Sequence, residues 1–152
     1  MSPDNRIVMN WDCQRQGCFN LKKRLKFGVF KECLPGNISF SDVDGIVEVN
    51  GNLLFLEWKD HPCLNTGQRI LFERLTRLCP ATVLIVEGDA EQMTVDAIRT
   101  VWRGQIAPAE VDDIDGLRAR IQQWSHWAMS NSAILQSQQP LEDIPVPTRS
   151  PA

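Results

Sequence analysis

The dipeptide Asn50-Gly51 is the feature that most constrains how this sequence can fold. Asn and Gly tolerate the positive φ angles of a two-residue type I′ turn, and apolar runs stand on both sides of the pair. We therefore expect a β-hairpin with strands at residues 38–49 and 52–59. Val49 then faces Asn52, so the numbers of paired residues sum to 101.

This register predicts a polar cluster at the open end of the hairpin. Asp44 falls opposite Glu57, and Asp42 falls opposite Lys59. Opposed residues share a face, as do residues two apart on one strand, so all four side chains should lie together. The same face should continue as core through Leu53, Phe55 and Ile46.

Folding alone does not require such a cluster. Two close carboxylates raise each other's pKa unless a cation lies between them, and Glu57 follows an apolar run that is typical of a buried strand. One interpretation is a set of ordinary surface salt bridges, each worth under about 1 kcal/mol. The interpretation that we favour is a divalent metal site of hard oxygen ligands with a lysine beside it.

The spacing of these residues resembles the PD-(D/E)xK nuclease superfamily, most closely its small resolvase-like and phage-type branch. Asp44 matches the aspartate of the motif, Glu57-Trp58-Lys59 matches ExK, and Gln68 matches the glutamine of the following helix. The resemblance covers about residues 30 to 90. It implies an α/β fold, a small mixed sheet flanked by helices with a restriction-endonuclease-like core.

The function implied by this resemblance is a Mg²⁺- or Mn²⁺-dependent nuclease that hydrolyses DNA phosphodiester bonds. Asp44, Glu57 and the Trp58 backbone carbonyl would hold the metal, and Lys59 would orient a water or stabilise the transition state. Gln68 would position the water or the lysine, although it could also be simply exposed. Asp42 would be a supporting acid or a ligand of a second ion. Glu32 loosely matches an extra acid that the superfamily often carries on its first helix.

A basic segment precedes the hairpin, between residues 14 and 31, and contains no acidic residue. It either tracks a DNA backbone or forms a solvated helix face. The residues that we expect to contact DNA are Lys22, Lys23, Arg24 and Lys26.

The cysteines allow a second kind of metal site. A tetrahedral zinc site could be formed by Cys13, Cys18, Cys33 and either Cys63 or His61. The four-residue gap between Cys13 and Cys18 is not the usual two-residue knuckle, and the alternative is that the cysteines are buried or incidental.

The rest of the chain predicts further elements of an α/β domain. A helix over residues 67–79, N-capped by Thr66, should bury a stripe of Ile70, Leu71, Leu75 and Leu78. Residues 82–87 read as a strand buried on both faces, parallel and adjacent to the strand that carries Glu57. Residues 97–106 read as a weaker strand or an irregular segment.

A last helix over residues 110–129 carries an apolar stripe at spacings of three and four, suited to core or homodimer packing. The stripe consists of Val111, Ile114, Leu117, Ile121, Trp124 and Ala128. We expect one nuclease-like domain at residues 1–130 and a disordered tail at 131–152, which is rich in Ser, Gln and Pro.

Composition places this domain among ordinary globular proteins. The chain has 152 residues, is 43% hydrophobic and carries a net charge of −3. No apolar run approaches the roughly 20 residues of a membrane span, and the amino end has no apolar signal region. We therefore expect a protein that has no membrane partner and lies in the cytoplasm, or in the bacterial host cytoplasm if it is phage-encoded. Its cysteines should be reduced there.

Two other functions fit the same residues. One is a non-catalytic nuclease-like module that binds DNA or a protein, for example a phage-encoded modulator of host machinery. The other is a zinc-stabilised interaction module, which would unfold when the metal is chelated.

Overall fold

The computed structural model of the chain describes residues 27–134, which fall into two units. Residues 27–40 form the smaller unit, with a 3₁₀ helix at Phe27–Cys33 (η2). Residues 41–134 form the larger unit and contain the sheet and both α-helices. The prediction of one continuous domain over residues 1–130 stays a prediction.

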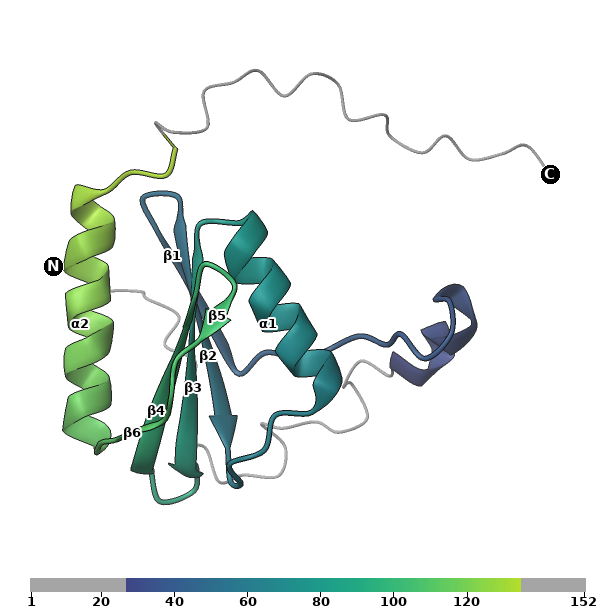
Figure 1. Ribbon diagram of the computed structural model, residues 1–152, viewed down its shortest axis with the longest axis horizontal. Helices are drawn as coiled ribbons and strands as arrows, with labels where there is room; N and C mark the ends of the chain where they lie inside the picture. The colour runs from purple at the N-terminus through teal and green to yellow at the C-terminus, as the bar shows by residue number, and fades with distance from the viewer. Residues whose placement is uncertain (1–26, 135–152) are drawn as a thin grey trace, which may run out of the picture. The chain divides into compact units, whose positions relative to one another are not determined.

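The larger unit is a mixed α/β structure built on a six-stranded sheet. The main path runs in the order β1-β2-β3-β4-β5, and β6 pairs with β4. The helices α1 and α2 lie on opposite sides of this sheet (Figure 1). The strands are Gly45–Val49 (β1), Asn52–Lys59 (β2), Ala81–Asp89 (β3), Thr94–Trp102 (β4), Gln105–Ile106 (β5) and Glu110–Val111 (β6), and the helices are Thr66–Leu78 (α1) and Ile114–Ser130 (α2). The expected α/β class with a small mixed sheet and flanking helices is confirmed.

The hairpin has the predicted turn and the predicted register. Asn50 and Gly51 have φ angles of 55° and 85°, the positive values that a type I′ turn needs. The ladder runs from Val49 opposite Asn52 to Gly45 opposite Leu56, so the pairs sum to 101.

The first strand is shorter than predicted, because β1 begins at Gly45 and residues 38–44 are not strand. The predicted backbone pairings of Asp44 with Glu57 and of Asp42 with Lys59 therefore do not form, because the ladder ends at Gly45 opposite Leu56. Ile46 is also not core: it is 61% exposed, because β1 is an edge strand.

The connection from β2 through α1 to β3 follows the prediction. The strand β3 lies parallel and next to β2, with Lys59 in register with Glu87. All six residues from Ala81 to Val86 are buried, as expected for a strand covered on both faces. The strand is longer than predicted, since it extends to Asp89.

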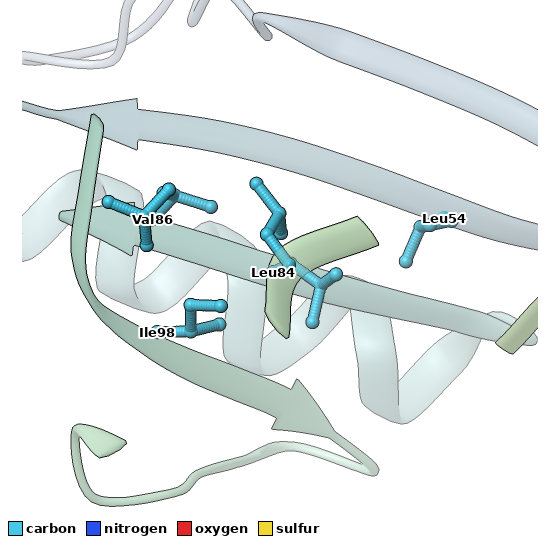
Figure 2. Close-up of a cluster of buried hydrophobic side chains, with 6 residues drawn as sticks. Leu54, Leu84, Val86 and Ile98 are labelled. Carbon is cyan, nitrogen blue, oxygen red and sulfur yellow. The ribbon is translucent and has the colours of Figure 1, made fainter. Parts of the chain in front are cut away.

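Two apolar clusters fix the helices on the sheet. Leu54, Leu84, Val86 and Ile98 belong to the cluster on the α2 side (Figure 2). The other cluster, on the α1 side, contains Phe72, Val83, Ile85 and Val101, with Phe55 packed against it. Alternate residues of β2 and β3 thus serve opposite clusters, which is the period of a strand.

The buried stripe of α1 differs from the predicted one. Phe72 and Thr76 are buried, whereas Ile70, Leu71 and Leu78 are exposed. The Thr76 hydroxyl fits the interior because it donates to the Phe72 carbonyl at 2.9 Å and accepts from the Gly104 N–H at 2.9 Å. The helix also begins one residue earlier than expected, and its N-cap is Asn65 rather than Thr66.

The segment predicted as a weaker strand or an irregular segment over residues 97–106 is instead part of an antiparallel hairpin formed by β4 and β5. The strands β4 and β5 are joined at Arg103 and Gly104, whose φ angles are 50° and 80°. Arginine rarely adopts a positive φ, so the sequence gives a weaker turn signal here than at Asn50.

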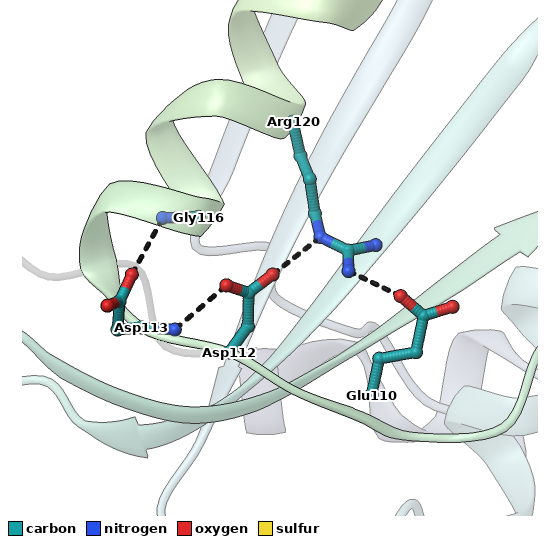
Figure 3. A network of polar contacts seen from close by, with 5 residues as sticks. All are labelled: Glu110, Asp112, Asp113, Gly116 and Arg120. Atoms are coloured by element: carbon teal, nitrogen blue, oxygen red, sulfur yellow. Dashed lines mark hydrogen bonds and ion pairs between the residues drawn. The ribbon is translucent and has the colours of Figure 1, made fainter.

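The last helix begins at Ile114, four residues later than predicted. Glu110 and Val111 instead pair with β4, and the Asp113 carboxylate caps the helix by accepting from the Gly116 N–H at 2.8 Å (Figure 3). Leu117 and Ala128 are buried, while Val111 is 93% exposed. Ile114, Ile121 and Trp124 pack against the α2-side cluster. The apolar stripe therefore packs against the sheet of the same chain, so the predicted homodimer would have to form through another face of α2.

An ion-pair network holds the start of α2 against β6. Arg120 contacts the carboxylates of Asp112 and Glu110 (Figure 3). Hydrogen bonds from Arg120 and from the Asp113 backbone N–H lower the pKa of Asp112 below its ordinary value. The pKa of Arg120 is raised, chiefly by its hydrogen bond to Glu110.

The residues after α2 return to the hairpin turn. Ala133 donates its N–H to the Asn50 carbonyl at 3.0 Å, and the Asn52 side chain donates to the Asn131 carbonyl at 2.7 Å. Residues 131 and 133 thus contact the hairpin, and the predicted disordered tail stays a prediction, because residues 135–152 lie outside the described residues.

Replacing Gly51 with alanine should destabilise the protein by about 1–3 kcal/mol, because φ at this residue is +85°. An added methyl group would also lie 2.8 Å from the backbone nitrogen of Ile134. The free energy of unfolding in urea measures the effect. The matched control is Gly67→Ala in the first turn of α1, where the methyl group would meet only the Asn65 side chain at 3.4 Å. Equal stability of Gly51→Ala and wild type would contradict the turn geometry.

Candidate functional site

The centre of the candidate site is the carboxylate of Glu57, near the end of β2. Glu57 is 5% exposed, and the four residues before it in the strand, Leu53 to Leu56, are all apolar. Two side chains contact its Oε1 atom: Lys59 Nζ lies at 2.6 Å and Gln68 Nε2 donates at 2.7 Å. An isolated buried carboxylate would be costly, so these two contacts explain how the charge is tolerated.

Lys59 shares a face with Glu57 because the two residues are two apart on the strand. The Lys59 side chain is 21% exposed, against 6% for Glu57, so the ammonium group lies nearer to solvent. The structure thus brings together the two ends of the predicted ExK motif.

Gln68 reaches Glu57 from the first turn of α1. Its position follows from helix geometry, since it lies four residues before Phe72 and eight before Thr76, on the buried stripe. The Asn65 side chain fixes the start of the helix by accepting from the Gln68 N–H at 2.8 Å. The prediction that Gln68 reaches towards the carboxylates is therefore confirmed for Glu57.

Asp44 lies at the edge of β2, beside the backbone of Trp58. Its Oδ2 atom accepts a hydrogen bond from the Trp58 N–H at 2.6 Å. If the ladder continued, the Trp58 N–H would pair with the backbone of residue 43. The Asp44 side chain takes the place of that backbone partner, and β1 begins only at Gly45. In a hydrogen-bonded pair the N–H and C=O of one residue face the same neighbour, so we expect the Trp58 carbonyl to face the side of Asp44.

The indole of Trp58 lies on the opposite face of the strand from Glu57 and anchors it. It packs against the α2-side cluster, and its Nε1 donates to the Gly88 carbonyl at 3.0 Å. This bond ties the end of β2 to the β-bulge at Glu87 and Gly88 in β3. The Trp58 backbone is therefore held from both sides.

A second ion pair on the same face was missed by sequence reasoning. Arg99 of β4 contacts Glu87 of β3 at 2.9 Å and donates to the Pro62 carbonyl at 3.4 Å. Glu87 is in register with Lys59. Without Arg99, the Glu87 carboxylate would compete with Glu57 for the Lys59 ammonium. The sequence marks Glu87 as a charged residue directly after an apolar run, as it marks Glu57, but nothing local identifies Arg99 as its partner.

The remaining predicted site residues are not part of this group. Asp42 is exposed and lies in the segment before β1. Glu32 and Cys33 are exposed in the unit of residues 27–40, and Cys63 is exposed in the loop before α1. The four basic residues predicted to contact DNA, and Cys13 and Cys18, lie outside the described residues. The zinc site and the DNA-binding segment stay predictions.

Few metal-ligating side chains gather near the end of β2. Within residues 27–134 no group of three or more His, Cys, Asp or Glu is arranged to hold an ion. Mg²⁺ usually needs only one or two carboxylates, because it keeps several waters and also binds substrate phosphate. The two carboxylates here are those of Asp44, which contacts the Trp58 N–H, and of Glu57, which precedes Trp58 in the strand. Both contacts to Glu57 use Oε1, so neither uses Oε2.

Comparisons with known proteins return no match: no family model, no curated protein and no solved structure matches this chain. Across residues 27–134, neither α-helix has the length and apolar character needed to cross a bilayer.

Replacing Arg99 with methionine should destabilise the protein by about 1–2 kcal/mol, between the values for exposed and fully buried pairs. The reason is that Glu87, whose side chain is 15% exposed, would lose its cation. Adding Glu87→Gln should recover part of the loss, which chemical denaturation measures as a coupling energy.

The matched control is Arg69→Met, which breaks a more exposed pair with Glu73 on α1 and should cost under about 0.5 kcal/mol. Strictly additive effects of Arg99→Met and Glu87→Gln would show that the two residues do not interact.

Proposed function

We propose that this protein is a nuclease that uses Mg²⁺ or Mn²⁺ to hydrolyse DNA phosphodiester bonds. The observation that carries the proposal is the contact of both Lys59 and Gln68 with one oxygen of the buried Glu57 carboxylate. An apolar residue in place of Glu57 would suit a buried strand better, so the cluster calls for a functional explanation.

The residues that would hold the metal are Asp44, Glu57 and the Trp58 carbonyl. The Asp44 bond to the Trp58 N–H supports this assignment, since it brings a carboxylate to the strand edge that the carbonyl should also face. A divalent ion bound there would acidify a water molecule and neutralise charge on the phosphate.

Lys59 has a different role from the two carboxylates. Its ammonium is held by Glu57 but is partly exposed, so it can donate to a phosphate oxygen or to the attacking water as negative charge develops. Gln68 would keep the Glu57 carboxylate in one rotamer, because its amide is fixed by the capped start of α1. DNA as the substrate comes from the resemblance of Asp44, Glu57, Lys59 and Gln68 to the nuclease motif.

A non-catalytic nuclease-like module is the second candidate. One observation favours it: Glu57 Oε1 already contacts the Lys59 ammonium and the Gln68 amide. The buried carboxylate is therefore compensated without a metal ion. Such a module would bind DNA or a protein without cleaving it.

Cleavage assays on plasmid, single-stranded and branched DNA with Mg²⁺ or Mn²⁺ separate the two candidates. Glu57→Gln and Lys59→Met should each lower the cleavage rate by at least about a hundredfold, because each removes a group that acts on the transition state. Circular dichroism and thermal melting should show that both variants remain folded.

The control variants are Glu73→Gln and Arg118→Met, which remove exposed charges on α1 and α2 and should cleave like wild type. Equal cleavage by all preparations would indicate a contaminating nuclease and overturn the proposal. Wild type without cleavage, but with retained DNA binding, would favour the non-catalytic module.

A further inference from the structure

A hollow of about 500 Å³ lies between α2 and the sheet, far from the candidate site. Its walls include Trp102, Trp124, Trp127 and Arg103, and its floor includes Thr82 and Thr100. These strand residues alternate with those that face α1, so the hollow and Glu57 lie on opposite faces of the sheet. The hollow and Glu57 also lie at opposite ends of the sheet. Thr82, paired with Trp102, is near the start of β3, whereas Glu57 is near the end of the parallel strand β2.

The tryptophans of the hollow offer ring faces to a ligand. Trp102 and Trp127 are 36% and 39% exposed, values that are high for residues in a folded core. Their rings meet edge to face, with centroids 5.6 Å apart and planes at 89°. The edge of one ring therefore meets the face of the other, whereas a parallel stack would cover one face of each ring.

The same surface carries positive charge without carboxylate partners. Arg103 lines the hollow and lies over the Trp102 ring, with its guanidinium carbon 5.3 Å from the ring centroid. Among the described residues Arg103 forms no salt bridge, unlike Arg120, which is held by Asp112 and Glu110.

The hollow also contains hydrogen-bonding groups. Gln123, Thr82 and Thr100 contribute an amide and two hydroxyls to its lining. Exposed tryptophan rings, an arginine without a carboxylate partner and scattered hydrogen-bonding groups are the combination that binds bases and phosphates of single strands.

We propose that this hollow binds single-stranded nucleic acid, with a base stacked on the tryptophans and a phosphate on Arg103. A duplex does not fit, because its base faces are hidden in the stack. A two-fold dimer centred on this surface is disfavoured, because it would bring Arg103 of both copies together. This inference does not depend on cleavage, since binding can be measured with the divalent ions removed.

The test uses the full chain in EDTA and a fluorescein-labelled oligothymidylate of about 15 nucleotides, within the range of known single-strand sites. Trp127→Leu and Arg103→Gln should each weaken binding by about tenfold, the effect of losing one stacked base or its cation. The control Arg118→Gln removes a charge that is 77% exposed on the same helix and should change affinity less than about twofold. Thermal melting checks that the variants are folded.

Further measurements identify the kind of nucleic acid that binds. Quenching of tryptophan fluorescence by the oligonucleotide should be reduced in Trp127→Leu, and a duplex of equal length should bind more weakly. Binding of oligouridylate distinguishes RNA from DNA, and binding of thymidine monophosphate distinguishes a free nucleotide from a strand. Equal affinity of wild type, Trp127→Leu and Arg103→Gln would overturn the proposal. So would equal binding of the duplex, or a loss of self-association in Trp127→Leu seen by sedimentation.

Discussion

The contact between the buried Glu57 carboxylate, Lys59 and Gln68 is the constraint on which the rest of the site depends. A carboxylate that is 5% exposed can remain charged only if cations or donors reach it, and both partners here reach one oxygen. One partner comes from the same strand and the other from α1. The position of α1 on the sheet is therefore part of the site.

Three local features bring these groups together. The type I′ turn at Asn50 and Gly51 sets the register that ends with Asp44 at the edge of β2. The parallel connection from β2 to β3 packs α1 on the face of Glu57 through Phe72. The indole of Trp58 fixes the end of β2 against the bulge in β3. Each feature is made by a few residues, and each restricts where the Glu57 carboxylate can point.

The parts of the fold that follow from short-range rules could be predicted from the sequence. Asn-Gly specifies its turn, and the turn fixes the register of the strand pairs that follow it, which is why the pairs from Val49–Asn52 to Gly45–Leu56 agree with the prediction. The apolar run of β3 likewise indicated a strand buried on both faces.

The errors arise where a polar side chain takes the place of an expected contact. The Asp44 carboxylate accepts the hydrogen bond that would have extended β1, so the strand was predicted too long. Thr76 is buried through its hydroxyl contacts, and a stripe chosen by hydrophobicity alone selected Leu71 and Leu78 instead. The pairing of Arg99 with Glu87 joins strands that have no shared local signal, so it required the tertiary structure.

The central claim is that Asp44, Glu57 and the Trp58 carbonyl bind one divalent ion, and paramagnetic broadening by Mn²⁺ tests it most directly. In a ¹⁵N-labelled sample, small amounts of Mn²⁺ should first remove the amide signals of residues 44 and 57–59, because broadening falls steeply with distance from the ion. The same signals should persist in Glu57→Gln at equal Mn²⁺. Broadening that begins elsewhere in the chain, or that is unchanged in Glu57→Gln, would contradict the account.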